Sequence, residues 1–245
     1  MILNIEALKN YSEPMIRQPD EYKYLPSIPN RICILAQSNS GKTVLIINML
    51  QKVYLKKYDD IFIISHSINL DKNWDSIRGQ IPNENLKDEY DEDEVKKIID
   101  RHLKIREKQK EAGKKRLGQL LVVLDDVIDN KDVISSKMDS ILTSLFIRGR
   151  HLGISVWFSS QKYKTAIPRI IRLNCSHYII FRLSQKSERE AILDEFSALV
   201  PMNELNQIYD EATNEKYSFL YIDKTKHDIN QIFHKKFERV FEIEE

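Results

Sequence analysis

The chain has 245 residues, enough for one sizeable α/β domain, and 42% hydrophobic with 31% charged residues is a globular composition. Its apolar runs are too short to span a bilayer, and its first residues lack the basic-then-apolar pattern of a signal peptide. A net charge of +1 neither indicates nor excludes a nucleic-acid partner. Cys33 and Cys175 lack CxxC spacing, which favours an intracellular setting and argues against structural zinc.

The order of the expected elements follows from alternating apolar and helical segments. Residues 1–30 contain scattered turn signals and are expected to form an irregular lead-in. Strands are predicted at 31–37, 60–67, 120–127, 154–161, 177–183 and 216–223, and helices at 42–57, 92–112, 135–151, 185–198 and 202–213. This alternation predicts an α/β fold with a mainly parallel central sheet, with one domain over 31–223 and a C-terminal tail over 224–245.

A charged helical insert is predicted at 83–118, acidic in its first part and basic in the rest. One interpretation is a solvated helix that lies over the domain. The other is that its basic side chains contact DNA phosphates or a partner. These side chains are Lys104, Lys108, Lys110, Lys114, Lys115 and Arg116.

The stretch AQSNSGKT fits the phosphate-loop pattern GxxxxGK[ST], with Ala36 in place of the first glycine. A predicted strand precedes it and a predicted helix follows it, so backbone N–H groups can point inward at phosphates above a helix start. Lys42 is expected to bridge the β- and γ-phosphates of ATP, and the Thr43 hydroxyl to ligate Mg²⁺. The alternative is a chance match in a polar turn. The predicted nucleotide-binding residues are Ala36, Gln37, Ser38, Asn39, Ser40, Gly41, Lys42 and Thr43.

Two adjacent carboxylates, Asp125 and Asp126, end the predicted strand LLVVLDDV. Ligands of parallel sheets bind at the C-terminal ends of the strands, so this pair is expected to face the phosphate loop. Asp125 is the predicted Mg²⁺ ligand, through water, and Asp126 the predicted base that orients or deprotonates the attacking water. Alone, the pair could equally be a strand exit in which Asp caps the next turn. Together, the two motifs predict a three-layer P-loop NTPase of the ASCE or RecA-like type.

Two further stretches bear on specificity and catalysis. NKDV at 130–133 begins like the guanine-reading N-K-x-D signature but ends in valine, which favours ATP over GTP. Gln161 ends the strand ISVWFSSQ, and a strand between those of the loop and the carboxylates would bring its amide to the γ-phosphate. Arg148 and Arg150 precede this strand and could neutralise charge at a neighbouring subunit's nucleotide. Alternatively, they are surface residues at a helix C-terminus.

Residues 149–161, GRHLGISVWFSSQ, resemble the corresponding segment of the FtsK–HerA superfamily of DNA-pumping ATPases. The RGRH form and the Asp-Asp pair are closest to the poxvirus-like genome-packaging ATPases of large DNA viruses and virophages. The resemblance covers roughly residues 30–183. In many cellular relatives Arg-Pro follows the glutamine, whereas Lys162 and Tyr163 follow it here.

The resemblance implies a homo-oligomeric ring, hexameric or pentameric, with ATP between subunits and double-stranded DNA through its centre. Arg150 is the first candidate for the arginine that acts in trans, and Arg148 the second. Capsid or virion components are implied partners, with a location in the host cytoplasm, at viral factories, or in the virion. The prediction is an ATP-hydrolysing translocase that packages viral DNA. The alternatives are a P-loop kinase, a helicase-like ATPase and a nucleotide-gated assembly protein without turnover.

Overall fold

The computed structural model describes residues 13–127 and 140–243. In that part of the chain, nine strands form one sheet in the order β3-β2-β4-β5-β1-β6-β7-β8-β9. The strands are β1 Arg31–Leu35, β2 Asp60–Ser65, β3 Leu86–Lys87, β4 Leu120–Asp125, β5 Ile154–Ser160, β6 His177–Phe181, β7 Phe219–Asp223, β8 Phe233–Lys235 and β9 Arg239–Val240. From β3 to β6 all neighbours are parallel, and β7, β8 and β9 extend the sheet antiparallel.

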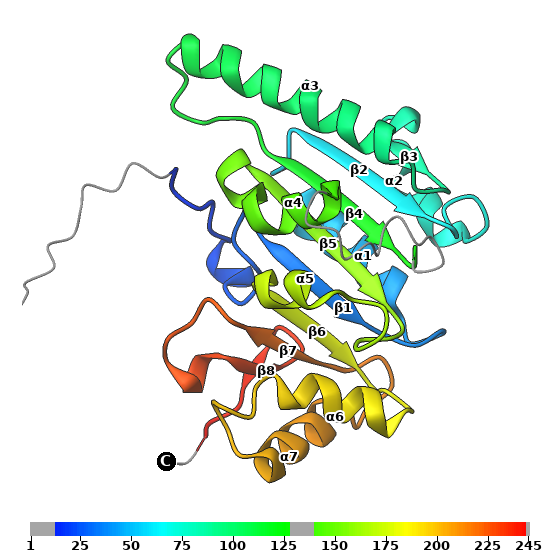
Figure 1. The fold of residues 1–245 in the computed structure, drawn as a ribbon, viewed down its shortest axis with the longest axis vertical. Helices are drawn as coiled ribbons and strands as arrows, with labels where there is room; N and C mark the ends of the chain where they lie inside the picture. Colours follow the sequence, from blue (N-terminus) through cyan, green and yellow to red (C-terminus); the bar gives the residue numbers. More distant parts are fainter. Residues whose placement is uncertain (1–12, 128–139, 244–245) are drawn as a thin grey trace, which may run out of the picture.

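Helices cover both faces of this sheet, so the predicted three-layer α/β fold is confirmed (Figure 1). They are α1 Lys42–Met49, which continues as a π-helical turn over Leu50–Tyr54, α2 Asp75–Arg78, α3 Glu92–Glu111, α4 Ile141–Arg148, α5 Arg169–Asn174, α6 Lys186–Asp194 and α7 Met202–Ala212. Alternate residues of each strand enter different cores. In β1, Ile32 and Ile34 pack with α1 and α2, whereas Cys33 and Leu35 pack on the face of α3 to α7.

The structure adds elements that the sequence pattern did not predict. α5 has six residues and β3 two, which is too short for a periodic pattern to develop. The sheet also continues beyond residue 223, where the domain was expected to end, because β8 pairs with β7 and β9 with β8. Of the lead-in, the described residues 13–30 pack on the domain, with Ile28 fully buried. The NKDV stretch and the first part of the predicted helix 135–151 lie outside the described residues.

The charged insert folds as α3, whose N-terminus is capped by the Asp91 side chain. Two of its polar side chains are buried: His102 approaches the Leu152 carbonyl, and Arg106 donates to the Gly118 carbonyl at 2.6 Å. Desolvation lowers the pKa of His102, so burial favours the neutral ring. The six basic side chains named above are exposed. α3 therefore lies over the domain and presents basic residues to solvent.

Candidate active site

The phosphate-loop stretch connects the C-terminal end of β1 to the first turn of α1. Ala36 is buried and its backbone N–H donates to the Ser160 carbonyl, which ties the start of the loop to the end of β5. Asn39 and Gly41 have positive φ angles of 62° and 90°, in the left-handed region that asparagine and glycine tolerate best. Gly41 caps α1 and Lys42 is its first residue. The chain thus turns sharply enough to place a helix N-terminus directly beneath the loop.

Asp125 is the last residue of β4, and its side chain is buried within hydrogen-bonding distance of several hydroxyl groups. Ser159 donates to Oδ1 at 2.7 Å, and Ser65 donates to Oδ2 at 3.1 Å. The Thr43 hydroxyl lies 3.4 Å from Oδ2. These hydrogen bonds satisfy the buried carboxylate oxygens and fix their orientation toward the start of α1.

Asp126 differs from its neighbour in exposure and in backbone conformation. Its side chain is 37% exposed, against 1% for Asp125, and its φ is 57°. Its backbone N–H donates to the Ser159 hydroxyl at 2.9 Å, which holds the turn after β4. A left-handed aspartate is an uncommon conformation that turns the second carboxylate away from the strand direction and toward the cavity.

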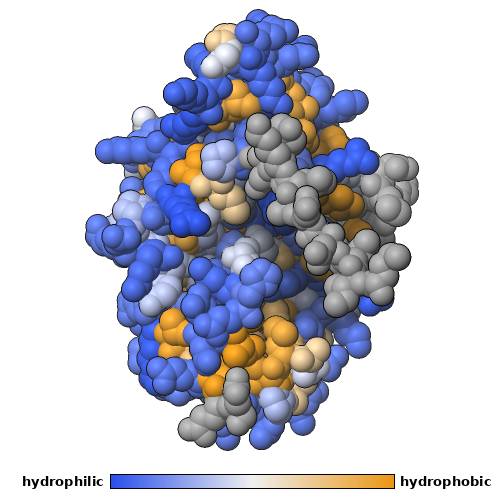
Figure 2. Space-filling model, turned by 90° about the vertical axis from the view of Figure 1, so that its left-hand side faces the viewer, coloured by the Kyte–Doolittle hydropathy of each residue, from blue (hydrophilic) through white to orange (hydrophobic). Residues whose placement is uncertain are grey.

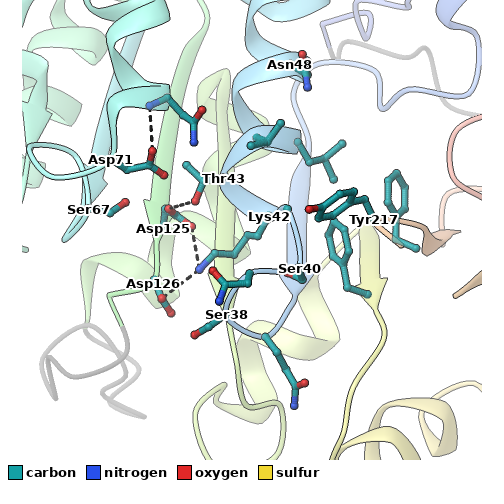
Figure 3. A pocket seen from close by; sticks show the side chains of 18 of the residues that line it. Ser38, Ser40, Lys42, Thr43, Asn48, Ser67, Asp71, Asp125, Asp126 and Tyr217 are labelled. Carbon is teal, nitrogen blue, oxygen red and sulfur yellow. Dashed lines mark hydrogen bonds and ion pairs between the residues drawn. The ribbon is translucent and has the colours of Figure 1, made fainter. Parts of the chain in front are cut away.

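Side chains from the ends of β1, β4 and β5 come together beside Lys42, and Figure 3 shows the side chains of Asp125 and Asp126 directed toward its ammonium. The ammonium lies 3.3 Å from Asp125 Oδ1 and 3.2 Å from Asp126 Oδ2. The Gln161 amide Nε2, just after β5, lies 3.1 Å from Asp126 Oδ2. This convergence follows from the strand order, because β5 lies between β4 and β1. The structure therefore places together the lysine, the carboxylate pair and the glutamine.

The remaining loop residues lie along the same cavity, which has a volume of about 1040 Å³. Gln37 donates to the Ser184 hydroxyl at 2.6 Å, and Ser38 and Asn39 are exposed. The Ser40 hydroxyl is buried without a hydrogen-bond partner in the described part of the chain. A buried hydroxyl without a partner, in a loop that leads into the N-terminus of α1, fits an anionic ligand.

A magnesium ion would fit between the Thr43 hydroxyl and the Asp125 carboxylate, which are hard oxygen ligands on the same side of Lys42. Residues 13–127 and 140–243 contain no cluster of three His, Cys, Asp or Glu side chains able to hold a metal. Mg²⁺ commonly takes only one or two protein oxygens and completes its shell with phosphate and water. The donor set is therefore suited to a metal that arrives with a nucleotide.

Arg148 and Arg150 are not part of this constellation. Arg148 ends α4, and both side chains are exposed just before β5 begins. The site lies where β5 ends, about 20 Å further along the strand at the usual rise per residue. These arginines therefore belong to the edge of the sheet opposite the site of their own chain.

Sequence reasoning missed Ser65 and Ser159, although both stand at strand ends, in DIFIIS and ISVWFSS. Serine is common at such positions, so the sequence alone does not indicate that either residue supports Asp125. Their role depends on the position of β2 and β5 on either side of β4 in the sheet, and this strand order is known only from the structure. Tyr217, which also lines the cavity, was missed for the same reason.

The fold and the site define a P-loop ATPase. The sequence profile of the family described as Poxvirus A32 protein matches residues 20–232, and the chain belongs to that family. It is 28% identical over 200 residues to the uncharacterized protein 075L of Invertebrate iridescent virus 6, covering 81% of this chain and 72% of that protein. The uncharacterized protein 088R of Invertebrate iridescent virus 3 is 26% identical, with 79% and 69% covered.

Solved structures show the same fold. The genome packaging NTPase B204 of Sulfolobus turreted icosahedral virus 2, in complex with AMP, has a TM-score of 0.56 at 15% identity, covering 87% of this chain and 97% of that chain. The monomer form of the pCW3 conjugation coupling protein TcpA has a TM-score of 0.54 at 14% identity, covering 86% and 63%. At these identities the likeness concerns the fold alone.

Proposed function

We propose that this protein is the ATP-driven motor that packages viral double-stranded DNA into a capsid, and that it works as a homo-oligomeric ring. One observation carries the proposal: Lys42, the carboxylate pair and Gln161 converge at the end of β1 in a chain of the Poxvirus A32 protein family. B204, which shares the fold, is a genome packaging NTPase, and this supports the same function for the present chain.

The chemistry follows from the roles that each side chain can take. A triphosphate in the loop would compete with Asp125 and Asp126 for the Lys42 ammonium, which then neutralises β- and γ-phosphate oxygens. Bound Mg²⁺, held by Thr43 and Asp125, would neutralise the remaining charge on those oxygens. Water attacks the γ-phosphorus, its proton passes to Asp126, and the bond from phosphorus to the bridging oxygen of ADP breaks.

Gln161 is suited to report whether the γ-phosphate is present. Its amide already contacts Asp126, and it can donate to phosphate and accept from the attacking water. The loop that follows is fixed by Glu188 at the start of α6, which accepts from the backbone N–H of Lys164 at 3.1 Å and from that of Tyr163. A change at Gln161 can therefore be passed to exposed Lys162 and Lys164, which are suited to DNA phosphates.

A ring is supported by the place of the two arginines. Arg148 and Arg150 are too far from their own site to act there and make no ion pair within the described residues, so any action of theirs on a triphosphate would be on that of another copy. Figure 2 faces the edge of the sheet at which the parallel strands begin, and the surface there is mainly hydrophilic, with hydrophobic areas in its upper and lower parts. None of the helices in the described part of the chain has the length and apolar character of a membrane span.

The direct test is the ATP turnover of the purified chain with and without blunt duplex DNA, together with its solution mass in the presence of a non-hydrolysable ATP analogue. We expect turnover that duplex DNA stimulates, a mass of five or six copies, and displacement of a third strand from a triplex as the motor moves along the duplex.

The other functions predict different results from the same samples. Transfer of phosphate to a small acceptor without any response to DNA would indicate a kinase. Unwinding of forked DNA without movement along blunt duplex would indicate a helicase. ATP binding without turnover under any condition would indicate an assembly protein gated by nucleotide.

A further inference from the structure

The cavity at the phosphate loop continues past Lys42, away from the carboxylates, to a second group of side chains. Tyr217 lies there, in the loop between α7 and β7, and Val44 and Asn48 of α1 face the same space. Figure 3 shows Tyr217 and Asp126 on opposite sides of Lys42. The proposed hydrolysis of the triphosphate assigns no function to Tyr217, Val44 or Asn48, which line this end of the cavity.

The strand order indicates which end of the cavity would hold the γ-phosphate and which end would hold the nucleoside. Asp125, Asp126 and Gln161 follow β4 and β5, on one side of β1, and must face the γ-phosphate if they act in hydrolysis. Tyr217 lies on the other side of β1, because β7 pairs antiparallel with β6 and begins at the same edge of the sheet. A nucleotide held by the loop would therefore extend its nucleoside toward β6 and β7.

Tyr217 is held in an unusual way for an exposed side chain. It is 56% exposed, yet its φ of 65° is in the left-handed region, which a bulky residue rarely adopts. Its ring covers Gly41: a Cβ added there would lie 3.0 Å from Tyr217 Cδ1. Strain of this kind persists only where surrounding contacts impose it, and it is concentrated at functional sites.

The surrounding loop supplies those contacts. Ser218 donates through its hydroxyl to the Ala212 carbonyl at 2.7 Å, and its backbone N–H donates to the Glu215 carbonyl at 3.2 Å. Glu215 pairs with Lys235 of β8 at 2.9 Å, and this hydrogen bond and charge lower the pKa of Glu215. The loop is thus tied to α7 and to the sheet, and the tyrosine ring is presented at a fixed place beside the phosphate loop.

The opposing surface of α1 matches a flat aromatic ligand with a polar edge. Val44 is 44% exposed although apolar, and Asn48 lies one turn later on the same helix face. The Asn48 side chain has no hydrogen-bond partner among the residues that the structure describes. An unpaired amide can donate and accept at once, which is the pattern that the N6 amino group and a ring nitrogen of adenine require.

We propose that Tyr217 stacks on the adenine base of the bound nucleotide, and that Asn48 hydrogen-bonds the polar edge of that base. The proposal rests on the proposed function, since it locates the nucleoside end of the same ligand. Aromatic rings bind bases through their faces. The Tyr217 ring is 56% exposed beside the phosphate loop, and the Lys216 ammonium, 4.8 Å from the ring centroid, would give way to the base.

Calorimetric titrations with two ligands, both in Mg²⁺, test this assignment: the ATP analogue AMPPCP, and inorganic tripolyphosphate, which has no base. We expect Tyr217→Ala to weaken AMPPCP about tenfold, and Asn48→Ala to weaken it about threefold. Neither variant should alter the affinity for tripolyphosphate. Tyr217→Phe, which keeps the ring, should bind both ligands as the unmodified chain does.

Leu70→Ala serves as the matched control, because Leu70 is 83% exposed and lines the other end of the cavity. It should change neither affinity. A selective loss of AMPPCP in Leu70→Ala, or equal losses of both ligands in Tyr217→Ala, would overturn the assignment, as would unchanged AMPPCP binding in Tyr217→Ala. If the unmodified chain binds neither ligand, the proposed function fails together with the inference.

Discussion

Two adjacent aspartates at the end of β4 have environments different enough to separate their roles. Asp125 is buried and accepts hydrogen bonds from Ser65 and Ser159, so its carboxylate is held in a fixed position suited to a metal. Asp126 is partly exposed, left-handed and in contact with Gln161, so it faces the space where water would attack. Neighbouring carboxylates in such unlike surroundings are suited to different steps of one reaction.

Asp126→Asn should therefore keep ATP binding and lower turnover by at least about a hundredfold, since it removes the proton acceptor. Asparagine tolerates positive φ, so the turn after β4 should be preserved. Lys42→Ala should instead lose binding itself. Equilibrium titration and steady-state turnover measure the two effects, with Asp75→Asn, a surface residue of α2, as control. Normal turnover in Asp126→Asn would remove this residue as the base.

The sequence predicted these side chains because each stands in a short motif with a physical requirement. The phosphate loop needs small residues and a lysine at a helix start, and the carboxylates need an apolar strand before them. Ser159 and Tyr217 could not be predicted in this way. Ser159 supports Asp125 only because β4 and β5 are neighbours, and Tyr217 reaches Gly41 only because β7 begins at the same edge.

At the scale of elements, one glycine outside α3 allows a buried side chain of this helix to pack on the domain. Gly153 has a φ of 66°, and a Cβ added there would lie 2.3 Å from Arg106 Nη1 and 3.0 Å from the Gly118 carbonyl. Arg106 is buried, donates to that carbonyl and pairs with Glu13 at 2.6 Å. A side chain at residue 153 would displace a buried guanidinium from its partners. This glycine therefore allows the charged insert to pack on the strands of the site.

Gly153→Ala should lower the free energy of unfolding by about 3 kcal/mol, combining left-handed strain with a displaced buried charge. Gly113→Ala is a matched control, because Gly113 has nearly the same φ, 67°, and nothing near its would-be Cβ. It should cost only about 1 kcal/mol. Urea unfolding of the two variants gives the comparison, and equal losses would contradict the proposed role of Arg106.

The sequence predicted the existence of this helix but not its contacts. The insert has a weak apolar stripe, and an arginine in a basic stretch is ordinarily solvent-exposed. Burial of Arg106 depends on the carbonyl of residue 118 and on the absence of a side chain at residue 153. These two positions lie close together because they precede the paired strands β4 and β5. The two-residue β3 and three-residue β8 likewise form only because a neighbouring strand is already in place.

In the whole molecule, the sheet separates two functional edges. The C-terminal ends of β1, β4 and β5 carry the nucleotide site, and the start of β5 carries Arg148 and Arg150. A single chain cannot bring these edges together, whereas a ring of identical chains can place one copy's arginine at the next copy's γ-phosphate. In the proposed ring the site would be divided between copies, and this is the reason to expect activity only from the assembly.

Mixtures of two inactive variants should therefore regain ATP turnover. Arg150→Ala subunits keep Asp126, and Asp126→Asn subunits keep Arg150, so some mixed interfaces hold a complete site. Alone, Arg150→Ala should lose at least about a thousandfold in turnover, and Asp126→Asn at least about a hundredfold. Lys42→Ala mixed with Asp126→Asn should regain nothing, because both defects lie in the same half of the site. Absence of recovery at every ratio of the first pair would exclude Arg150 as the trans-acting group.

Convergence of three strand ends on one triphosphate is best tested by a structure of the chain bound to Mg²⁺ and AMPPCP. We expect a γ-phosphate within hydrogen-bonding distance of Lys42 and Gln161, with the metal between the Thr43 hydroxyl and Asp125. A triphosphate bound elsewhere, or one that leaves Asp126 and Gln161 without contact to the γ-phosphate or its water, would contradict it.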